Sequence, residues 1–170
     1  MTDAPNDVRA GLARLARLAI GLWALLGGLV LCAVVIVNVY STAAGAIFGT
    51  PFSGDFEMTE VGVGVAVFAF LPYCQITGAN VTADIFTARA STRTVAVLRF
   101  AASIVALGFA ALLLWRMSAG LLDQKAYGYT TAILQFPHWI AFIPILASLA
   151  LLAIASLITA GEAWQDARTG

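Results

Sequence analysis

The feature that most constrains this chain is its long runs of residues without a charge. Residues 18–54 and 61–83 contain no Asp, Glu, Lys or Arg. A run of about 20 mostly apolar residues is long enough to cross the hydrocarbon core of a bilayer as a helix. Only 11% of the 170 residues are charged and 61% are hydrophobic, whereas soluble domains carry about 25% charged residues. The sequence therefore predicts an all-α integral membrane protein.

Four stretches qualify as spans, and we predict one membrane domain that covers residues 1–170. The first span ends near Asn38 and Ser41, polar residues typical of an interface. Gly45 and Gly49 then form a G-x-x-x-G pattern, which is typical either of close helix packing or of a turn. The four predicted transmembrane helices cover about 18–42, 57–78, 95–117 and 138–160.

The segment that follows the second span is polar. Asn80 and Asp84 lie where the chain leaves the membrane. Residues 80–90 combine such polar positions with apolar ones, and an Asn at the start of this segment can cap a helix. We therefore expect a short amphipathic segment that lies in the membrane interface.

The distribution of Lys and Arg predicts the orientation. Seven of the nine basic residues belong to the N-terminal flank, the second loop region or the C-terminal tail, and two, Arg116 and Lys125, flank the third loop. Basic residues concentrate on the cytoplasmic side of membrane proteins. We therefore expect both termini in the cytoplasm, and the first and third loops on the outer side.

Carboxylates open the second span at its outer edge. Asp55 precedes Glu57 and Glu60, which are three residues apart and therefore share a helix face. An ionisable residue at membrane depth is a functional candidate, and an acidic flank among lipid headgroups is the alternative interpretation. The same face continues as a small and apolar stripe suited to packing against another helix, formed by Gly64, Val67, Leu71, Cys74 and Gly78.

Several function classes find no support in the sequence. The formal net charge of zero does not favour nucleic-acid binding. Cys32 and Cys74 form no C-x-x-C pair, which disfavours a zinc or dithiol site. His138 is the single histidine, whereas a haem held by two histidines needs a second one. No G-x-S-x-G, P-loop or H-E-x-x-H pattern occurs. We therefore predict no enzymatic activity, metal or cofactor.

Three motifs carry a resemblance to a known family. The first is Thr-Glu-Val around Glu60, and the second is Gly-Ala-Asn-Val-Thr-Ala-Asp from Gly78 to Asp84. The third is Leu-Gln-Phe-Pro-His-Trp-Ile around Pro137, followed by Ile-Pro at Pro144. With these motifs and its four spans, nearly the whole chain resembles the DctQ-like small membrane subunit of tripartite ATP-independent periplasmic (TRAP) transporters.

The resemblance implies a role in the bacterial inner membrane. It implies that the chain braces a large membrane subunit that carries the transport pathway. A periplasmic substrate-binding protein would deliver an organic acid, and a sodium gradient would drive its uptake. At Asn80 family members often carry a histidine, so the asparagine favours hydrogen bonding over a proton-linked role. The candidate interface or docking residues are Asp55, Glu57, Glu60, Gly64, Asn80, Asp84, Pro137 and Pro144.

Two other functions compete with this interpretation. A self-sufficient small exporter of the tetraspan multidrug type would use a glutamate in mid-membrane, whereas Glu57 and Glu60 lie at the edge of their span. A membrane anchor of a respiratory enzyme is the other alternative, and the single His138 argues against its haem-bearing version.

Overall fold

The computed structural model describes residues 4–79 and 92–169, and this part of the chain forms four helices and no strand. Each helix is long and apolar enough to cross a membrane, which confirms the predicted all-α fold with four transmembrane helices. The predicted interfacial segment 80–90, with Asn80 and Asp84, lies outside the described residues. The helices are α1 (Ala4–Phe48), α2 (Asp55–Thr77), α4 (Thr92–Tyr127) and α5 (His138–Thr169).

Three of the helices are longer than the spans drawn from the sequence. α1 has 45 residues and at about 1.5 Å per residue is about 67 Å long, about twice the thickness of the hydrocarbon core. The predicted spans end at charged and polar residues. A helix continues through residues such as Arg14 and Arg17 because its backbone groups pair within the helix in water as well as in lipid. α4 and α5 likewise continue to Tyr127 and Thr169.

Glycines with positive φ follow the ends of three helices. Gly49 (φ 71°), Gly78 (φ 67°) and Gly128 (φ 64°) lie directly after α1, α2 and α4. Glycine adopts this left-handed conformation at little cost. The Gly49 amide donates to the Gly45 carbonyl oxygen at 3.1 Å, and a Cβ on Gly45 would lie 3.4 Å from Pro51. The G-x-x-x-G pattern therefore forms the end of α1 and the turn after it.

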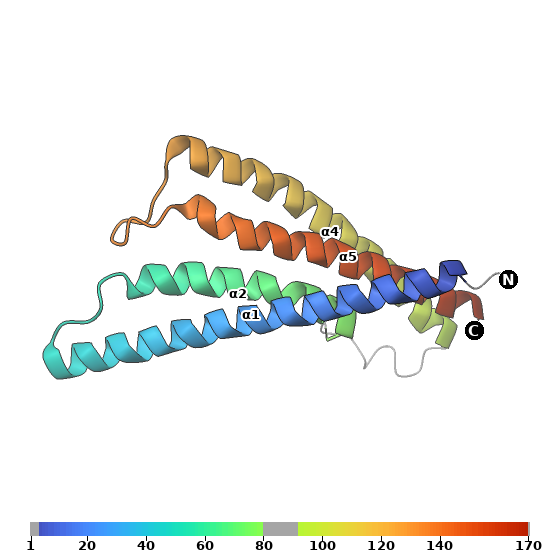
Figure 1. Ribbon diagram of the computed structural model, residues 1–170, viewed down its shortest axis with the longest axis horizontal. Helices are drawn as coiled ribbons and strands as arrows, with labels where there is room; N and C mark the ends of the chain where they lie inside the picture. Colours follow the sequence, from blue (N-terminus) through green and yellow to red (C-terminus); the bar gives the residue numbers. More distant parts are fainter. Residues whose placement is uncertain (1–3, 80–91, 170) are drawn as a thin grey trace.

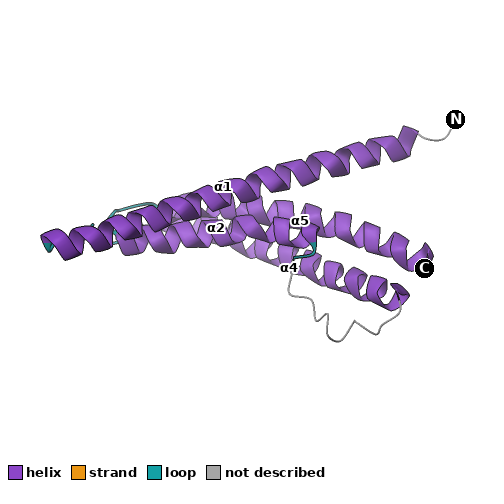
Figure 2. Cartoon of the chain, turned by 90° about the horizontal axis from the view of Figure 1, so that it is seen from below, coloured by secondary structure: helices purple, strands orange, loops and turns teal. Residues whose placement is uncertain are grey.

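The helices form two hairpins, α1–α2 and α4–α5 (Figure 1). α2 packs against α1 and α5, and α5 packs against α4 and touches α1. Both termini lie at one end of the bundle, as Figures 1 and 2 show, which we call the termini end. The opposite end, which we call the loop end, carries the turn 49–54 and the connection 128–137.

Two apolar clusters hold the helices together. One lies between α4 and α5 and receives side chains from α2; its buried members are Ala110, Ile145, Leu149 and Leu152. The other joins α1, α2 and α5 through Ile20, Ile76 and Ala155. α1 and α2 approach closely where their side chains are small, since a Cβ on Gly27 would lie 2.7 Å from the Cβ of Ala69.

The face that α2 buries in its own bundle is largely separate from the predicted stripe suited to packing against another helix. Its buried residues are Ala66, Ala69, Pro72 and Ile76. Ala69 follows Glu60 by nine residues, so at about 100° per residue the two lie on opposite sides of the helix. Of the predicted stripe, Leu71 contacts the core, whereas Val67 is exposed. The face of Glu60 and Val67 therefore points away from α1, α4 and α5, the other helices that the structure describes.

Candidate functional site

Polar side chains at the loop end form the candidate site, and Asp55 connects its first two segments. Asp55 Oδ2 accepts a hydrogen bond from Ser41 Oγ at 2.5 Å. Ser41 Oγ in turn accepts one from the Phe52 backbone N–H at 3.1 Å. The Ser41 side chain is buried, with 1% of it exposed, so these bonds are shielded from competing water. They fix the end of α1, the turn 49–54 and the start of α2 to one another.

A second pair of polar side chains lies one turn deeper. Asn38 Nδ2 donates to Thr59 Oγ1 at 2.7 Å and to the Val34 carbonyl oxygen at 2.9 Å. Thr59 Oγ1 donates to the Asp55 carbonyl oxygen at 2.7 Å. Because Asn38 and Ser41 are three residues apart on α1, both point towards α2. As polar residues at the end of a span, these two predict an interface, and their helical spacing inside an apolar run is the signal of their pairing with α2.

Glu57 joins α2 to the connection between α4 and α5. Its Oε1 accepts from the Ile133 backbone N–H at 2.7 Å, and its Oε2 accepts from the Leu134 backbone N–H at 2.9 Å. Such bonds to a carboxylate are stronger than bonds between neutral groups. The connection is also closed on itself, because Thr131 N donates to the Phe136 carbonyl oxygen at 3.0 Å. Glu57 therefore holds a preformed loop against α2.

Gly54 allows the same loop to lie close to the turn 49–54. Its φ is 96°, and a Cβ at this position would lie 2.6 Å from Leu134 Cγ. A larger residue would therefore push Leu134 away. Next to Leu134 is a cavity of about 570 Å³ between α1, α2 and the connection. Its lining is mostly apolar and includes Val30, Val34, Val61, Phe136 and Pro137, with Glu57 among the few polar members.

The loop end brings together three of the eight predicted site residues. Asp55 and Glu57 hold the two loops, and Pro137 pairs with Thr130 across the base of the connection. The Pro137 carbonyl oxygen also accepts from the Ile140 backbone N–H at 3.1 Å, in the first turn of α5. Pro137 therefore marks the boundary between the connection and α5.

The remaining candidates lie elsewhere. Glu60 is exposed and makes no hydrogen bond or ion pair within the described part of the chain. A Cβ on Gly64 would meet nothing within 4 Å. Pro144 lies inside α5, where its carbonyl oxygen accepts from Ser148 Oγ at 2.8 Å, and Trp23 Nε1 donates to the same hydroxyl at 2.8 Å. Asn80 and Asp84 lie outside the described residues.

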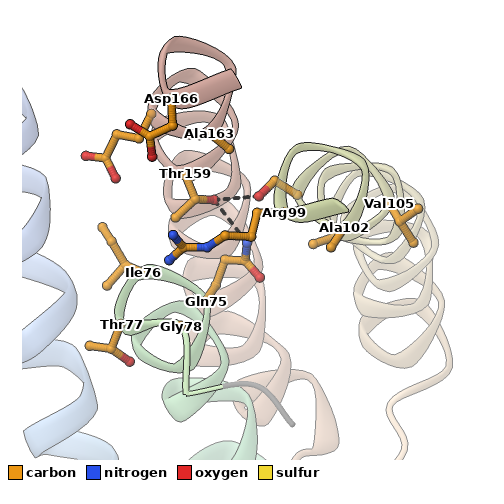
Figure 3. A pocket seen from close by; sticks show the side chains of 13 residues that line it. Gln75, Ile76, Thr77, Gly78, Arg99, Ala102, Val105, Thr159, Ala163 and Asp166 are labelled. Atoms are coloured by element: carbon orange, nitrogen blue, oxygen red, sulfur yellow. Dashed lines mark hydrogen bonds between the residues drawn. The ribbon is translucent and has the colours of Figure 1, made fainter. Parts of the chain in front are cut away.

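A second polar cluster, which the sequence did not reveal, lies near the termini end. Gln75 Nε2 donates to Thr159 Oγ1 at 3.0 Å, and the Ser103 and Thr159 hydroxyls are 3.1 Å apart, so α2, α4 and α5 meet there (Figure 3). These bonds border a pocket of about 470 Å³. Nearby, Arg17 Nη2 and Glu162 Oε1 form an ion pair at 2.5 Å between α1 and α5. Gln75 and Thr159 are 84 residues apart, and no local spacing indicates such a pairing.

The polar side chains at the loop end make hydrogen bonds that hold segments of the chain together. The carboxylates of Asp55 and Glu57 accept hydrogen bonds from a hydroxyl and from backbone N–H groups. Within residues 4–79 and 92–169, no group of three or more His, Cys, Asp or Glu side chains is placed to hold a metal ion. The arrangement orders two loops at one end of a membrane bundle.

Comparison with known proteins identifies a family that this chain resembles over most of its length. The family model described as "Tripartite ATP-independent periplasmic transporters, DctQ component" matches residues 31–166. The matched part contains all of α2 and α4 and most of α5. No curated protein and no solved structure matches the chain.

Proposed function

The chain belongs to the DctQ component family of the tripartite ATP-independent periplasmic transporters, and from this membership we propose that it is the small membrane subunit of a solute importer. A large membrane subunit carries the transport pathway, and a periplasmic binding protein delivers an organic acid. A sodium gradient drives uptake across the bacterial inner membrane. The observation that carries the proposal is the family match over residues 31–166, which covers most of a chain with four helices able to span a membrane.

In this proposal the subunit is non-catalytic and braces the large subunit. Its packing supports that role. One apolar cluster joins α2, α4 and α5 and another joins α1, α2 and α5. Polar contacts such as Gln75–Thr159 and Trp23–Ser148 fix helices to one another. α1 and α4 also carry many exposed large apolar side chains, which suit contact with lipid or with another membrane subunit. A stiff bundle with apolar outer faces is what a brace requires.

The loop end is the proposed docking surface for the periplasmic binding protein. The distribution of basic residues predicts that this end faces outwards. Asp55 and Glu57 hold the turn 49–54 and the connection 128–137 against the helices. A surface that is ordered before binding loses less conformational entropy when a partner docks. These contacts therefore favour the loop end as a docking surface.

Deleting the gene for this chain tests the proposal. We expect the deletion strain to lose uptake of the labelled organic acid that the intact three-component system imports, while the large subunit is still present in the membrane by immunoblot. A plasmid copy of the gene should restore uptake, and replacing external sodium with potassium should abolish it. Undiminished uptake in the deletion strain would show that the chain is not a required subunit.

A further inference from the structure

One side of α2 is not covered by α1, α4 or α5, the other helices within the described residues. The exposed fractions are 76% for Phe56, 37% for Val63 and 51% for Val67, and Glu60 is exposed among them. At about 100° per residue these side chains point to the same side of α2, and a Cβ on Gly64, beside them, would meet nothing within 4 Å. We call this surface, formed by Phe56, Glu60, Val63, Gly64 and Val67, the Glu60 face.

The length of α2 fixes how deep Glu60 lies. α2 has 23 residues, about 35 Å of helix, and the hydrocarbon core is about 30 Å thick. Little of the helix can therefore extend beyond the hydrocarbon. Glu60 is the sixth residue of α2 and is exposed on the surface of the bundle. The length of α2 and the predicted orientation therefore put it at the outer edge of the apolar layer. An ionised carboxylate in such a position is costly unless it has a partner.

The described part of the chain offers Glu60 no such partner. Glu57, one turn earlier, has both oxygens occupied by backbone N–H groups, but Glu60 makes no hydrogen bond or ion pair with any described residue. Among the basic residues, Arg17 pairs with Glu162 near the termini end, and Lys125 lies over the Trp139 ring, 5.4 Å from its centroid. No described residue supplies Glu60 with a positive charge, and a partner molecule can do so.

We propose that a helix of the large membrane subunit packs against the Glu60 face and places an Arg or Lys beside Glu60. The proposal rests on the function proposed above and specifies which surface of the small subunit meets the large one. Charge complementarity favours a protein helix, because a lipid acyl chain carries no positive charge that could pair with the Glu60 carboxylate. Gly64, one turn deeper, leaves room for the partner backbone to approach closely. The apolar side chains around them would then contact the same helix.

Co-purification of the large subunit with the tagged small subunit tests the proposal. The variants Glu60→Gln, Glu60→Lys and Gly64→Leu should each recover at least about tenfold less large subunit, since breaking one shielded charge pair or blocking a close approach costs that much affinity. Gly64→Leu has open space in the chain itself, so its own yield and thermal stability should match the wild type.

Matched controls separate the Glu60 face from general effects. Asp123→Asn removes another exposed carboxylate, near the end of α4. Gly161→Leu enlarges an exposed glycine on α5 with nothing within 4 Å of its Cβ position. Both should recover the large subunit as the wild type does. A charge exchange is the positive test: the loss in Glu60→Lys should be reversed when one Arg or Lys in a membrane helix of the large subunit is changed to Glu.

The possible failures point to different conclusions. If wild-type small subunit recovers no large subunit, the proposed function itself is wrong. If the wild type recovers it, and Glu60→Gln, Glu60→Lys and Gly64→Leu recover it equally well, the complex exists but does not use the Glu60 face. That second result would overturn this inference alone and would assign Glu60 to the lipid headgroups.

Discussion

Glu57 and Glu60 show how two carboxylates one turn apart acquire different surroundings. They are three residues apart, so they lie about 60° apart around the helix. Glu57 faces the connection between α4 and α5 and accepts two backbone N–H groups there, whereas Glu60 is exposed on the uncovered side of α2. The sequence spacing placed them on one broad face, and only the position of the connection distinguishes them.

Replacing Glu57 with Ala should loosen the connection. The backbone N–H groups of Ile133 and Leu134 would lose their acceptor, so hydrogen exchange in a peptide covering residues 128–137 should become several-fold faster. The measurement is hydrogen–deuterium exchange by mass spectrometry on the purified protein. Glu60→Ala is the control and should leave exchange in that peptide unchanged. Equal protection in Glu57→Ala and wild type would show that the loop is ordered by its own internal bonds.

At the scale of the helices, polar side chains decide which elements are fixed to one another. The Trp23 indole joins α1 to α5 through Ser148. Nearer the termini end, Thr159 contacts Gln75 of α2 and Ser103 of α4. Hydrogen bonds of this kind inside a membrane contribute about 0.6 kcal/mol on average. Their main effect is to select one arrangement of helices whose contact surfaces are otherwise uniformly apolar.

Thr159→Val should weaken the contact between the two hairpins. The substitution keeps the side-chain shape but removes the hydroxyl that meets Gln75 and Ser103, so we expect a loss of about 1 kcal/mol in unfolding free energy. Unfolding in mixed detergent micelles, followed by circular dichroism, measures it. Thr77→Val is the matched control, because the Thr77 hydroxyl bonds the Tyr73 carbonyl oxygen of its own helix at 2.7 Å. A loss of the same size in both variants would contradict the proposed role of Thr159 between helices.

At the scale of the whole molecule, the four spanning helices within residues 4–79 and 92–169 place both termini at one end of the bundle (Figure 1). The bundle is long, and its loop end is ordered by side chains from α1 and α2. The basic residues predict that the termini end faces the cytoplasm. This orientation determines whether the loop end can meet a periplasmic protein, so the proposed docking role depends on it.

Cysteine labelling tests the orientation. In a background where Cys32 and Cys74 are replaced by Ala, Ser53→Cys should react with a membrane-impermeant thiol reagent added to intact cells with a permeable outer membrane. Arg89→Cys should react only after the inner membrane is broken. Ser53 is exposed in the turn between α1 and α2, so its access is limited by the membrane alone. The reverse pattern would overturn the prediction that both termini are cytoplasmic.

The sequence by itself predicted a helical membrane protein with four spans, and the described residues form four helices that can span a membrane. Charge-free runs of this length must satisfy their backbone groups internally in lipid, and a helix does so within one segment. It also indicated that Asp55, Glu57 and Pro137 belong to one region, because charge and proline mark the ends of spans locally. These are properties of short stretches of chain, and local patterns reveal them.

The tertiary structure decided which residues touch. Glu57 meets Leu134 across 77 residues of sequence, and Gln75 meets Thr159 across 84. The sequence also does not predict which side of α2 is buried, because a helix that is apolar on nearly every side shows little periodicity. The positions of α1, α5 and the 128–137 connection made that choice. Ala69 is buried against the other helices. The connection donates hydrogen bonds to Glu57, and Glu60 is left exposed.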